Sequence, residues 1–351
     1  MILRNQTKAV HIGGVPVGGG NPIIIQSMTN TDTRDVKATV AQIHALTEAG
    51  CEIVRVAVLD TEAAQAIKQI KKEIDIPLVA DIHFDHRLAI ESVKSGVDKL
   101  RINPGNIGSE SRVRQVAEAA KSAEIPIRVG VNGGSLEKEI LAKYGGVTAQ
   151  GLAESALANV SQLEKFGFND IVVSVKASDV TLMLDSHKIL AERLNYPLHI
   201  GLTESGTPYA GAIRSAAGLG ALLSLGLGDT MRVSLSGDPV AEIRAAREIL
   251  SAMGLRRFGV TVIACPTCGR CDIDVAGIAT RLEIRLADIK TPLTIAVMGC
   301  AVNGPGEARE ADIGIAGGRG KAVLFRKGEI IRSISEAEIE DNILSELANF
   351  A

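Results

Sequence analysis

The chain has 351 residues, of which 46% are hydrophobic and 23% charged, and a formal net charge of −3. This balance argues against a nucleic-acid-binding surface, and no apolar run reaches the roughly 18–20 residues of a membrane span. Residues 1–22 lack the apolar core of a signal peptide, so we expect a cytoplasmic protein. Because Trp is absent and aromatic residues total 3%, the core must be mainly aliphatic, as in parallel sheets covered by helices.

Short β-branched segments alternate with amphipathic, Ala-rich segments from about residue 23 to residue 253. Strands are predicted at Ile23–Met28, Glu52–Val58, Pro77–Phe84, Lys99–Asn103, Pro126–Asn132, Asp170–Lys176, Pro197–Glu204 and Thr230–Ser236. Helices are predicted at Val36–Ala49, Glu62–Ile74, Ser109–Ala123, Leu152–Phe166, Leu182–Leu194 and Pro239–Met253. Eight strands that alternate with helical segments predict a (β/α)8 TIM barrel at residues 1–255. A doubly wound open sheet is the alternative, but its Gly-rich phosphate turn would follow the first strand, whereas Gly18, Gly19 and Gly20 precede it.

Polar residues lie near the C-terminal ends of the predicted strands, which face the mouth of the active site in such barrels. They are Gln26, Arg55, Asp81, Arg101, Asn103, Arg128, Asn132, Lys176, His199, Glu204, Arg232, Ser234 and Ser236. A single buried Arg is most simply paired with a carboxylate, but this does not explain polar groups on all the strands. Because five cations face two carboxylates in this set, we expect an anionic ligand with more than one phosphoryl group.

Glu204 is the best acid–base candidate on this rim, because it ends the seventh predicted strand. An ion pair with a neighbouring Arg is the simpler structural explanation of its carboxylate. The chain contains no Walker motif, no acidic cluster that would bind Mg²⁺ and no His-Glu-x-x-His pair.

The pattern changes after Met253, with a linker expected at Leu255–Gly259. Strands are predicted at Val260–Ala264, Leu293–Met298, Ile313–Ala316, Ala322–Arg326 and Glu329–Ser333, and helices at Ile273–Ile289 and Glu336–Ala348. We therefore expect a small α+β domain at residues 256–351.

Four cysteines of this second domain lie in two short motifs, CPTCGRC at 265–271 and MGCAVNGPGE at 298–307. Cys265, Cys268 and Cys271 have C-x2-C-x2-C spacing, and Cys300 follows 29 residues later. Such a group of thiols indicates an iron–sulfur cluster or a zinc site, although zinc would favour a second CxxC pair. Cys51, in the barrel, is expected to be an ordinary buried residue.

These cysteine motifs resemble those of the 4-hydroxy-3-methylbut-2-en-1-yl diphosphate synthase family of the methylerythritol phosphate route to isoprenoids. The barrel motifs QSMTNTDT, LRINPGN, RVGVNGGSLE, HIGLTESG and RVSLSGDP resemble the same family, so the resemblance covers essentially the whole chain. It implies an iron–sulfur oxidoreductase that reductively opens the ring of 2-C-methyl-D-erythritol 2,4-cyclodiphosphate. The product would be 4-hydroxy-3-methylbut-2-enyl diphosphate, formed by adding two electrons and losing water.

The resemblance also implies roles for individual residues. A [4Fe-4S] cluster would be held by Cys265, Cys268, Cys300 and Glu307, which makes Cys271 a bystander. A carboxylate is a harder and weaker ligand of iron than a thiolate, so the iron at Glu307 can exchange it for a substrate oxygen. Glu204 would handle a proton, and reduced flavodoxin or ferredoxin would supply the electrons. The residues implied in substrate binding are Arg55, Arg101, Asn103, Arg128, Asn132, Lys176, His199, Arg232, Ser234 and Ser236.

Chain geometry adds an expectation about assembly. The predicted helix Pro239–Met253 runs back toward the N-terminal end of the barrel over about 22 Å, and the linker reaches at most about 18 Å. One chain is therefore not expected to bring its second domain over its own active-site mouth. We expect a head-to-tail homodimer in which each second domain covers the barrel of its partner.

Two alternatives stay open at the level of the sequence. The first is a transferase similar to dihydropteroate synthase that carries a structural metal domain. The second is an iron–sulfur or zinc sensor on an inactive barrel, although the complete set of rim cations together with Glu204 argues against it.

Overall fold

The computed structural model describes residues 2–350 apart from 288, 301–305 and 307. Contacts divide the chain into two compact units, Met1–Arg256 and Arg257–Ala351. Among the described residues, no helix is both long and apolar enough to cross a membrane.

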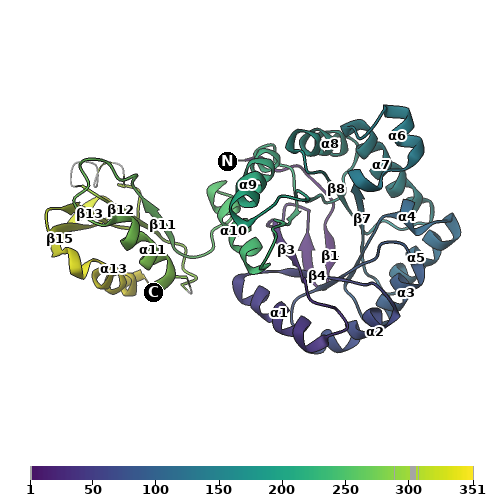
Figure 1. Cartoon of the computed structure of the whole chain (residues 1–351), viewed down its shortest axis with the longest axis horizontal. Helices are drawn as coiled ribbons and strands as arrows, with labels where there is room; N and C mark the ends of the chain where they lie inside the picture. Colours follow the sequence, from purple (N-terminus) through teal and green to yellow (C-terminus); the bar gives the residue numbers. More distant parts are fainter. Residues whose placement is uncertain (1, 288, 301–305, 307, 351) are drawn as a thin grey trace. The chain divides into compact units, whose positions relative to one another are not determined.

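The first unit is a closed parallel barrel, with its helices arranged as a ring around the strands (Figure 1). The strand order is β8-β7-β6-β5-β4-β3-β10-β9, and a parallel bridge between Val173 and Leu198 joins its two ends. The strands are β3 (Ile24–Met28), β4 (Ile53–Ala57), β5 (Leu78–Asp81), β6 (Lys99–Ile102), β7 (Ile127–Asn132), β8 (Ile171–Lys176), β9 (His199–Ile200) and β10 (Thr230–Met231). The predicted TIM barrel is confirmed.

Each long helix of the barrel follows a strand, and several begin at an Asp side chain that accepts a backbone N–H of the first turn. Asp35, Asp60 and Asp179 cap their helices in this way. The helices are α1 (Val36–Ala49), α2 (Thr61–Ile70), α3 (His86–Lys94), α4 (Pro104–Ile107), α5 (Glu110–Ser122), α6 (Lys138–Tyr144), α7 (Ala149–Lys165), α8 (Val180–Arg193), α9 (Pro208–Ser224) and α10 (Val240–Ala252), with a 3-10 turn at Gly133–Ser135.

An N-terminal hairpin that the sequence did not predict covers the N-terminal end of the barrel. Its strands, β1 (Val10–Ile12) and β2 (Val15–Val17), are antiparallel and joined by Gly13 and Gly14, whose φ angles of 51° and 87° favour glycine. Ile12 and Val17 pack with Ile24, Ile53 and Val79 of the first barrel strands. The polar C-terminal ends of the strands therefore form the opposite end of the barrel.

The seventh and eighth strands are shorter than predicted, at two residues each. The chain leaves the sheet at Gly201, where a Cβ atom would lie 2.6 Å from the carbonyl oxygen of Arg232. It then turns at Glu204, whose φ of 56° is incompatible with a strand. Glu204, Arg232, Ser234 and Ser236 consequently lie in loops beyond the strand ends.

The second unit is a five-stranded sheet in the order β11-β12-β13-β14-β15. Its first three strands are parallel, and β14 and β15 continue the sheet as antiparallel hairpins. The elements are β11 (Thr261–Ala264), α11 (Val275–Arg285), β12 (Thr294–Met298), β13 (Ile313–Gly318), β14 (Lys321–Arg326), β15 (Glu329–Ser335), a 3-10 turn (Glu336–Glu338), α13 (Ile339–Leu347) and a final turn (Ala348–Phe350). One face of the sheet packs against α11 and α13, and the other against Ala308 and Ala311.

Candidate active site

Cationic side chains from successive strands are buried inside the barrel. Alternate residues of a strand face the same side, so Lys99 and Arg101 of β6 share one face, as do Arg128 and Gly130 of β7. The guanidinium of Arg101 takes the space beside Gly130, where a Cβ atom would lie 2.5 Å from Arg101 Nε. The full set is Arg55, Lys99, Arg101, Arg128, Lys176 and, half-buried after β10, Arg232.

Asp81, at the end of β5, anchors two of these cations. Arg101 Nη1 donates to Asp81 Oδ1 at 3.0 Å, and Arg55 Nε lies 3.6 Å from Asp81 Oδ2. Burial acts to raise the pKa of Asp81, but the charge of Arg55 and the hydrogen bond from His83 hold that pKa well below its usual value. Asp81 is therefore ionised and fixes both guanidinium groups in position.

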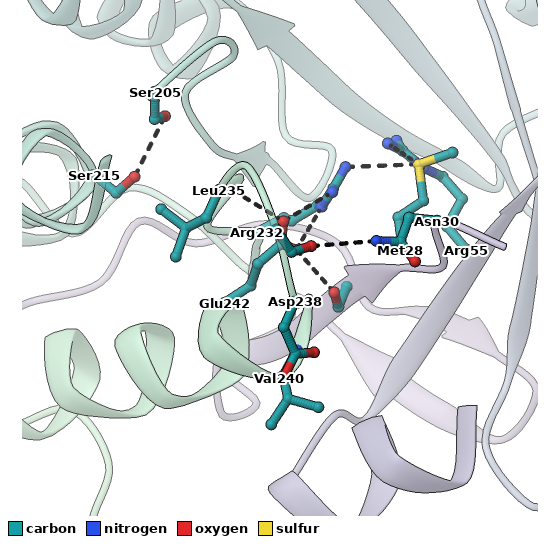
Figure 2. A network of polar contacts seen from close by, with 12 residues as sticks. Met28, Asn30, Arg55, Ser205, Ser215, Arg232, Leu235, Asp238, Val240 and Glu242 are labelled. Atoms are coloured by element: carbon teal, nitrogen blue, oxygen red, sulfur yellow. Dashed lines mark hydrogen bonds and ion pairs between the residues drawn. The ribbon is translucent and has the colours of Figure 1, made fainter. Parts of the chain in front are cut away.

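Glu242, on α10, is a second buried anchor and was missed by the sequence reasoning (Figure 2). It accepts hydrogen bonds from Arg232 Nε and Nη2, both at 3.1 Å, from Ser27 Oγ at 2.9 Å and from the Leu235 backbone N–H at 3.0 Å. These bonds fix the loop after β10. The sequence contains a signal for Glu242. It precedes Ala246 by one helical turn and Ile249 by two, so its side chain lies on the apolar, buried face of the predicted helix.

Met28, at the end of β3, lies between two of the guanidinium groups (Figure 2). Its sulfur accepts Arg55 Nη2 at 2.9 Å and lies 3.6 Å from Arg232 Nη1. A thioether is an uncharged acceptor, so it positions both cations without neutralising either.

Several of the buried cations have no hydrogen-bond partner among the described residues. The unpaired atoms include Lys99 Nζ and Arg128 Nε and Nη1. Burial, followed by neighbouring positive charges, holds the pKa values of Lys99, Arg128 and Lys176 well below their ordinary values. Burial also lowers the pKa of Arg55 to about 10, although Asp81 acts in the opposite direction. Cations outnumber the carboxylates paired with them, so this interior suits an anionic ligand.

The polar residues predicted beside these cations are also brought to this end of the barrel. Asn103 is buried and accepts the Gly105 backbone N–H at 3.2 Å. Asn132, with its amide oriented to suit both neighbours, accepts Arg101 Nη2 at 3.1 Å and donates to the Val131 carbonyl oxygen at 3.2 Å. Ser234 is half-buried, whereas Ser236 is exposed.

His199, on β9, is fully buried and bonded through Nδ1 to Thr230 Oγ1 at 2.7 Å. Burial and then the charges of Arg128 and Lys176 hold its pKa well below the ordinary value, so the imidazole is neutral. Its Nε2 has no hydrogen-bond partner among the described residues.

Glu204 lies in the exposed loop after β9 and forms no ion pair with the described residues. Its φ of 56° is a conformation that side chains other than Gly, Asn and Asp rarely adopt, and such conformations cluster at functional sites. The loop is fixed on both sides. Ser215 Oγ donates to Ser205 Oγ at 3.5 Å (Figure 2), and the Ser236 backbone N–H donates to the Gly206 carbonyl oxygen at 3.0 Å. The loops that carry Glu204 and Ser236 are thus joined.

In the second unit, two neighbouring parallel strands deliver cysteines to the same edge of the sheet. Cys265 follows β11, and Cys300 lies two residues beyond β12. The Gly299 backbone N–H donates to Cys265 Sγ at 3.2 Å. A Cβ atom on Gly299 would lie 2.5 Å from Cys271 Sγ, so Cys271 packs against the same glycine.

The thiols of Cys265 and Cys271 differ in their hydrogen bonds. Cys265 Sγ accepts an N–H, as a thiolate ligand does, whereas Cys271 Sγ donates to the Ile273 carbonyl oxygen at 3.1 Å. Cys268 is exposed, and its carbonyl oxygen accepts the Cys271 backbone N–H at 2.9 Å. The described residues contain no group of three or more His, Cys, Asp or Glu side chains that could hold a metal ion, and Glu307 lies outside them. The donor set at this edge, thiols beside backbone N–H groups, fits a thiolate-bound cofactor.

Family models match most of the chain. The GcpE TIM-barrel domain matches residues 7–247, and the GcpE protein C-terminal domain matches residues 261–349. This chain belongs to the GcpE family. It is 58% identical over 345 residues to the 4-hydroxy-3-methylbut-2-en-1-yl diphosphate synthase (flavodoxin) of Caldanaerobacter subterraneus subsp. tengcongensis, covering 98% of this chain and 97% of the relative.

A second GcpE relative gives the same result. The chain is 58% identical over 346 residues to the 4-hydroxy-3-methylbut-2-en-1-yl diphosphate synthase (flavodoxin) of Listeria monocytogenes serovar 1/2a, covering 99% of this chain and 94% of the relative. These relatives confirm the resemblance that the cysteine and barrel motifs carried.

Solved structures of similar fold each cover about 70% of this chain. Dihydropteroate synthase from Stenotrophomonas maltophilia has a TM-score of 0.52 at 15% identity, covering 71% of this chain and 98% of that one. The Yersinia pestis dihydropteroate synthase has a TM-score of 0.51 at 11% identity, covering 70% of this chain and 98% of that one. At such identities the likeness is one of fold, so it does not support the alternative of a related transferase.

Proposed function

We propose that this chain catalyses the reductive ring opening of 2-C-methyl-D-erythritol 2,4-cyclodiphosphate to 4-hydroxy-3-methylbut-2-enyl diphosphate. The observation that carries the proposal is a barrel interior in which buried cations outnumber their carboxylates, in a chain that is 58% identical to relatives named for this product. A cyclic diphosphate carries the negative charges that such an interior lacks.

The barrel is the proposed substrate-binding domain. Arg55 and Arg101, fixed by Asp81, present guanidinium donors to one side of the diphosphate. Arg128 has no such anchor among the described residues, so its donors are available to the ligand. The proposed binding residues are Arg55, Arg101, Asn103, Arg128, Asn132, Lys176, His199, Arg232, Ser234 and Ser236.

Glu204 is the proposed proton-handling residue. The reaction adds two electrons and removes one substrate hydroxyl as water, so a proton must reach the departing oxygen. The loop holds Glu204 in a left-handed backbone conformation at the end of the barrel that also holds the cations. An exposed carboxylate there can exchange its proton with solvent between turnovers.

The second unit is the proposed iron–sulfur cluster domain. We assign the ligands of a [4Fe-4S] cluster to Cys265, Cys268, Cys300 and Glu307. When bound, this cofactor supplies the electrons and the Lewis acidity that side chains lack. The hydrogen bond that Cys271 donates to Ile273 supports its role as a bystander. Reduced flavodoxin, named in the relatives, or ferredoxin is the proposed electron donor.

The function is tested on protein purified without oxygen. We expect a brown protein with iron and sulfide in equal amounts that converts the cyclodiphosphate when reduced flavodoxin is supplied. A colourless protein that contains zinc, or one that is active without a reductant, would contradict the proposal.

We also propose a head-to-tail homodimer in which each cluster domain covers the barrel of the partner. Apolar side chains are exposed in segments that follow the C-terminal ends of the barrel strands, which is unusual for a surface that contacts only water. Phe84 and Tyr209 expose 69% and 80% of their surface. The others are Leu59, Val147 and Ile213. A second copy of the chain that covers this end would bury them and exclude water from the substrate.

A mixed dimer tests this assembly. One chain carries Glu204→Gln and the other Cys300→Ser, with different affinity tags so that only the mixed dimer is isolated. Assembly across chains leaves one of the two sites complete, so we expect about half of the wild-type activity. Each variant alone serves as an inactive control. An inactive mixed dimer would show that each site is built from one chain.

A further inference from the structure

Lys99 is a buried cation that the roles proposed above leave without a function. It starts β6, two residues before Arg101 and on the same face of the strand, so it lies deeper in the barrel. Its side chain is fully buried, and Nζ has no hydrogen-bond partner among the described residues. A buried, unpaired lysine destabilises a fold, and an aliphatic residue would fill the same space without that cost.

Among the described residues, the groups around Lys99 offer it no counter-charge. Its register partner on β5 is Val79, and the charges that act on it come from Arg128 on β7 and Arg55 on β4. The one carboxylate on a neighbouring strand, Asp81, is paired with Arg101 and Arg55. Burial first, and then Arg128 and Arg55, hold the pKa of Lys99 well below its ordinary value. Lys99 therefore lies among cations rather than in an ion pair.

Other unpaired donors belong to the same region. Arg128 leaves Nε and Nη1 unpaired, and His199 leaves Nε2 unpaired, among the described residues. The charges of Arg128, Lys176 and Lys99 all depress the pKa of His199, which shows that these groups lie within electrostatic reach of one another. Tetrahedral phosphoryl oxygens can accept several such donors at once.

We propose that Lys99 is the innermost anion-binding residue of the barrel, where it contacts the phosphoryl group held by Arg128 and takes up a proton as that group binds. The identity of the phosphoryl group as part of a diphosphate rests on the proposed function. The proton comes from solvent, and the ammonium ion that Lys99 then carries pairs with the phosphoryl oxygens.

The pH dependence follows from the direction of the pKa change. In the free protein the pKa of Lys99 is lowered, and a bound anion raises it again. Between these two pKa values, binding takes up a proton and affinity falls as pH rises, by up to about tenfold per pH unit for one proton. Below the lower of these two pKa values, Lys99 is protonated in both the free and the bound protein. Binding then takes up no proton at Lys99, and this residue no longer makes the affinity depend on pH.

The test is calorimetric titration of the full chain, purified without oxygen, with inorganic diphosphate. Two phosphate-free buffers of different ionisation enthalpy give the number of protons taken up. We compare the wild type with Lys99→Met, which keeps the aliphatic chain, and with the control Lys72→Met at an exposed site. We expect Lys99→Met to bind about 10- to 100-fold more weakly, the loss of one charged hydrogen bond, and to lose about one proton of uptake. The control should match the wild type.

Two results would overturn the proposal. The first is wild-type binding without proton uptake, which needs no substitution and so does not depend on a variant that folds. The second is a Lys99→Met or Lys99→Gln protein that binds diphosphate with wild-type affinity and uptake. Turnover with reduced flavodoxin is measured separately. A chain that binds diphosphate as described but never converts the cyclodiphosphate contradicts the proposed function and leaves the role of Lys99 supported.

Discussion

Replacing Cys300 by Ser is expected to remove the bound iron and to lower turnover below detection, whereas Cys271→Ser keeps both near the wild-type level. Cys300 lies beyond β12, next to the glycine whose N–H is donated to Cys265. The Cys271 thiol instead donates to the Ile273 carbonyl oxygen, and a serine hydroxyl can donate in the same way. Iron and sulfide content, together with the visible absorbance spectrum, are measured for both variants.

The pair of substitutions separates loss of a ligand from loss of packing, because both thiols lie near Gly299. Thermal unfolding of the two variants without iron should be similar. If Cys271→Ser loses its iron as completely as Cys300→Ser, the assignment of Glu307 as the fourth ligand is wrong and Cys271 takes its place.

Glu204→Gln is expected to lower kcat by about 10²- to 10⁴-fold, the usual contribution of a positioned proton donor. The affinity for inorganic diphosphate should change little, because Glu204 is exposed and forms no ion pair with the described cations. The substitution keeps the size of the side chain, so we expect the left-handed backbone conformation of this position to be retained. Steady-state turnover and diphosphate titration of the same preparation measure the two effects.

A variant at Glu204 that loses diphosphate affinity while keeping kcat would assign the residue to substrate binding instead. Asp81→Asn is the matched comparison, because it removes the charge that orients Arg55 and Arg101. We expect Asp81→Asn to change the affinity for diphosphate rather than kcat.

The sequence predicted the barrel well because its strands are short, β-branched and regularly spaced. It failed where tertiary contacts override local pattern. Helix α9 was not among the predicted helices, since its glycines lower helix propensity; Gly218 is needed because a Cβ atom there would lie 2.5 Å from Leu202 Cδ1. The ends of β9 and β10 were also wrong, because the close approach of Gly201 to the Arg232 carbonyl oxygen is visible only in three dimensions.

The candidate site was predicted in outline for a similar reason. A polar residue within a β-branched segment indicates a functional side chain, and that rule found Arg55, Arg101 and Arg128, although Arg55 and Arg128 lie inside β4 and β7 rather than at their C-terminal ends. It missed Lys99, which lies at the start of its strand, and Glu242, whose partner Ser27 is 215 residues away in the sequence. Lys99 could have been predicted because it lies on the same face of β6 as Arg101. Glu242 could have been predicted because it lies on the apolar face of α10.

The way in which the barrel holds its cations has a consequence for the stability of the protein. Arg101 donates to the Gly130 carbonyl oxygen, and Arg55 and Arg232 lie against the thioether of Met28. These partners are uncharged, and the carboxylates of Asp81 and Glu242 offset only part of the positive charge, so repulsion among the buried cations persists until an anion enters. The free protein consequently has a lower free energy of unfolding than it would have if these charges were neutralised. This loss of stability accompanies the affinity of the barrel for anions. Selection for a more stable barrel alone would replace Met28 by an acidic residue, and the ligand would then compete with the protein's own carboxylate.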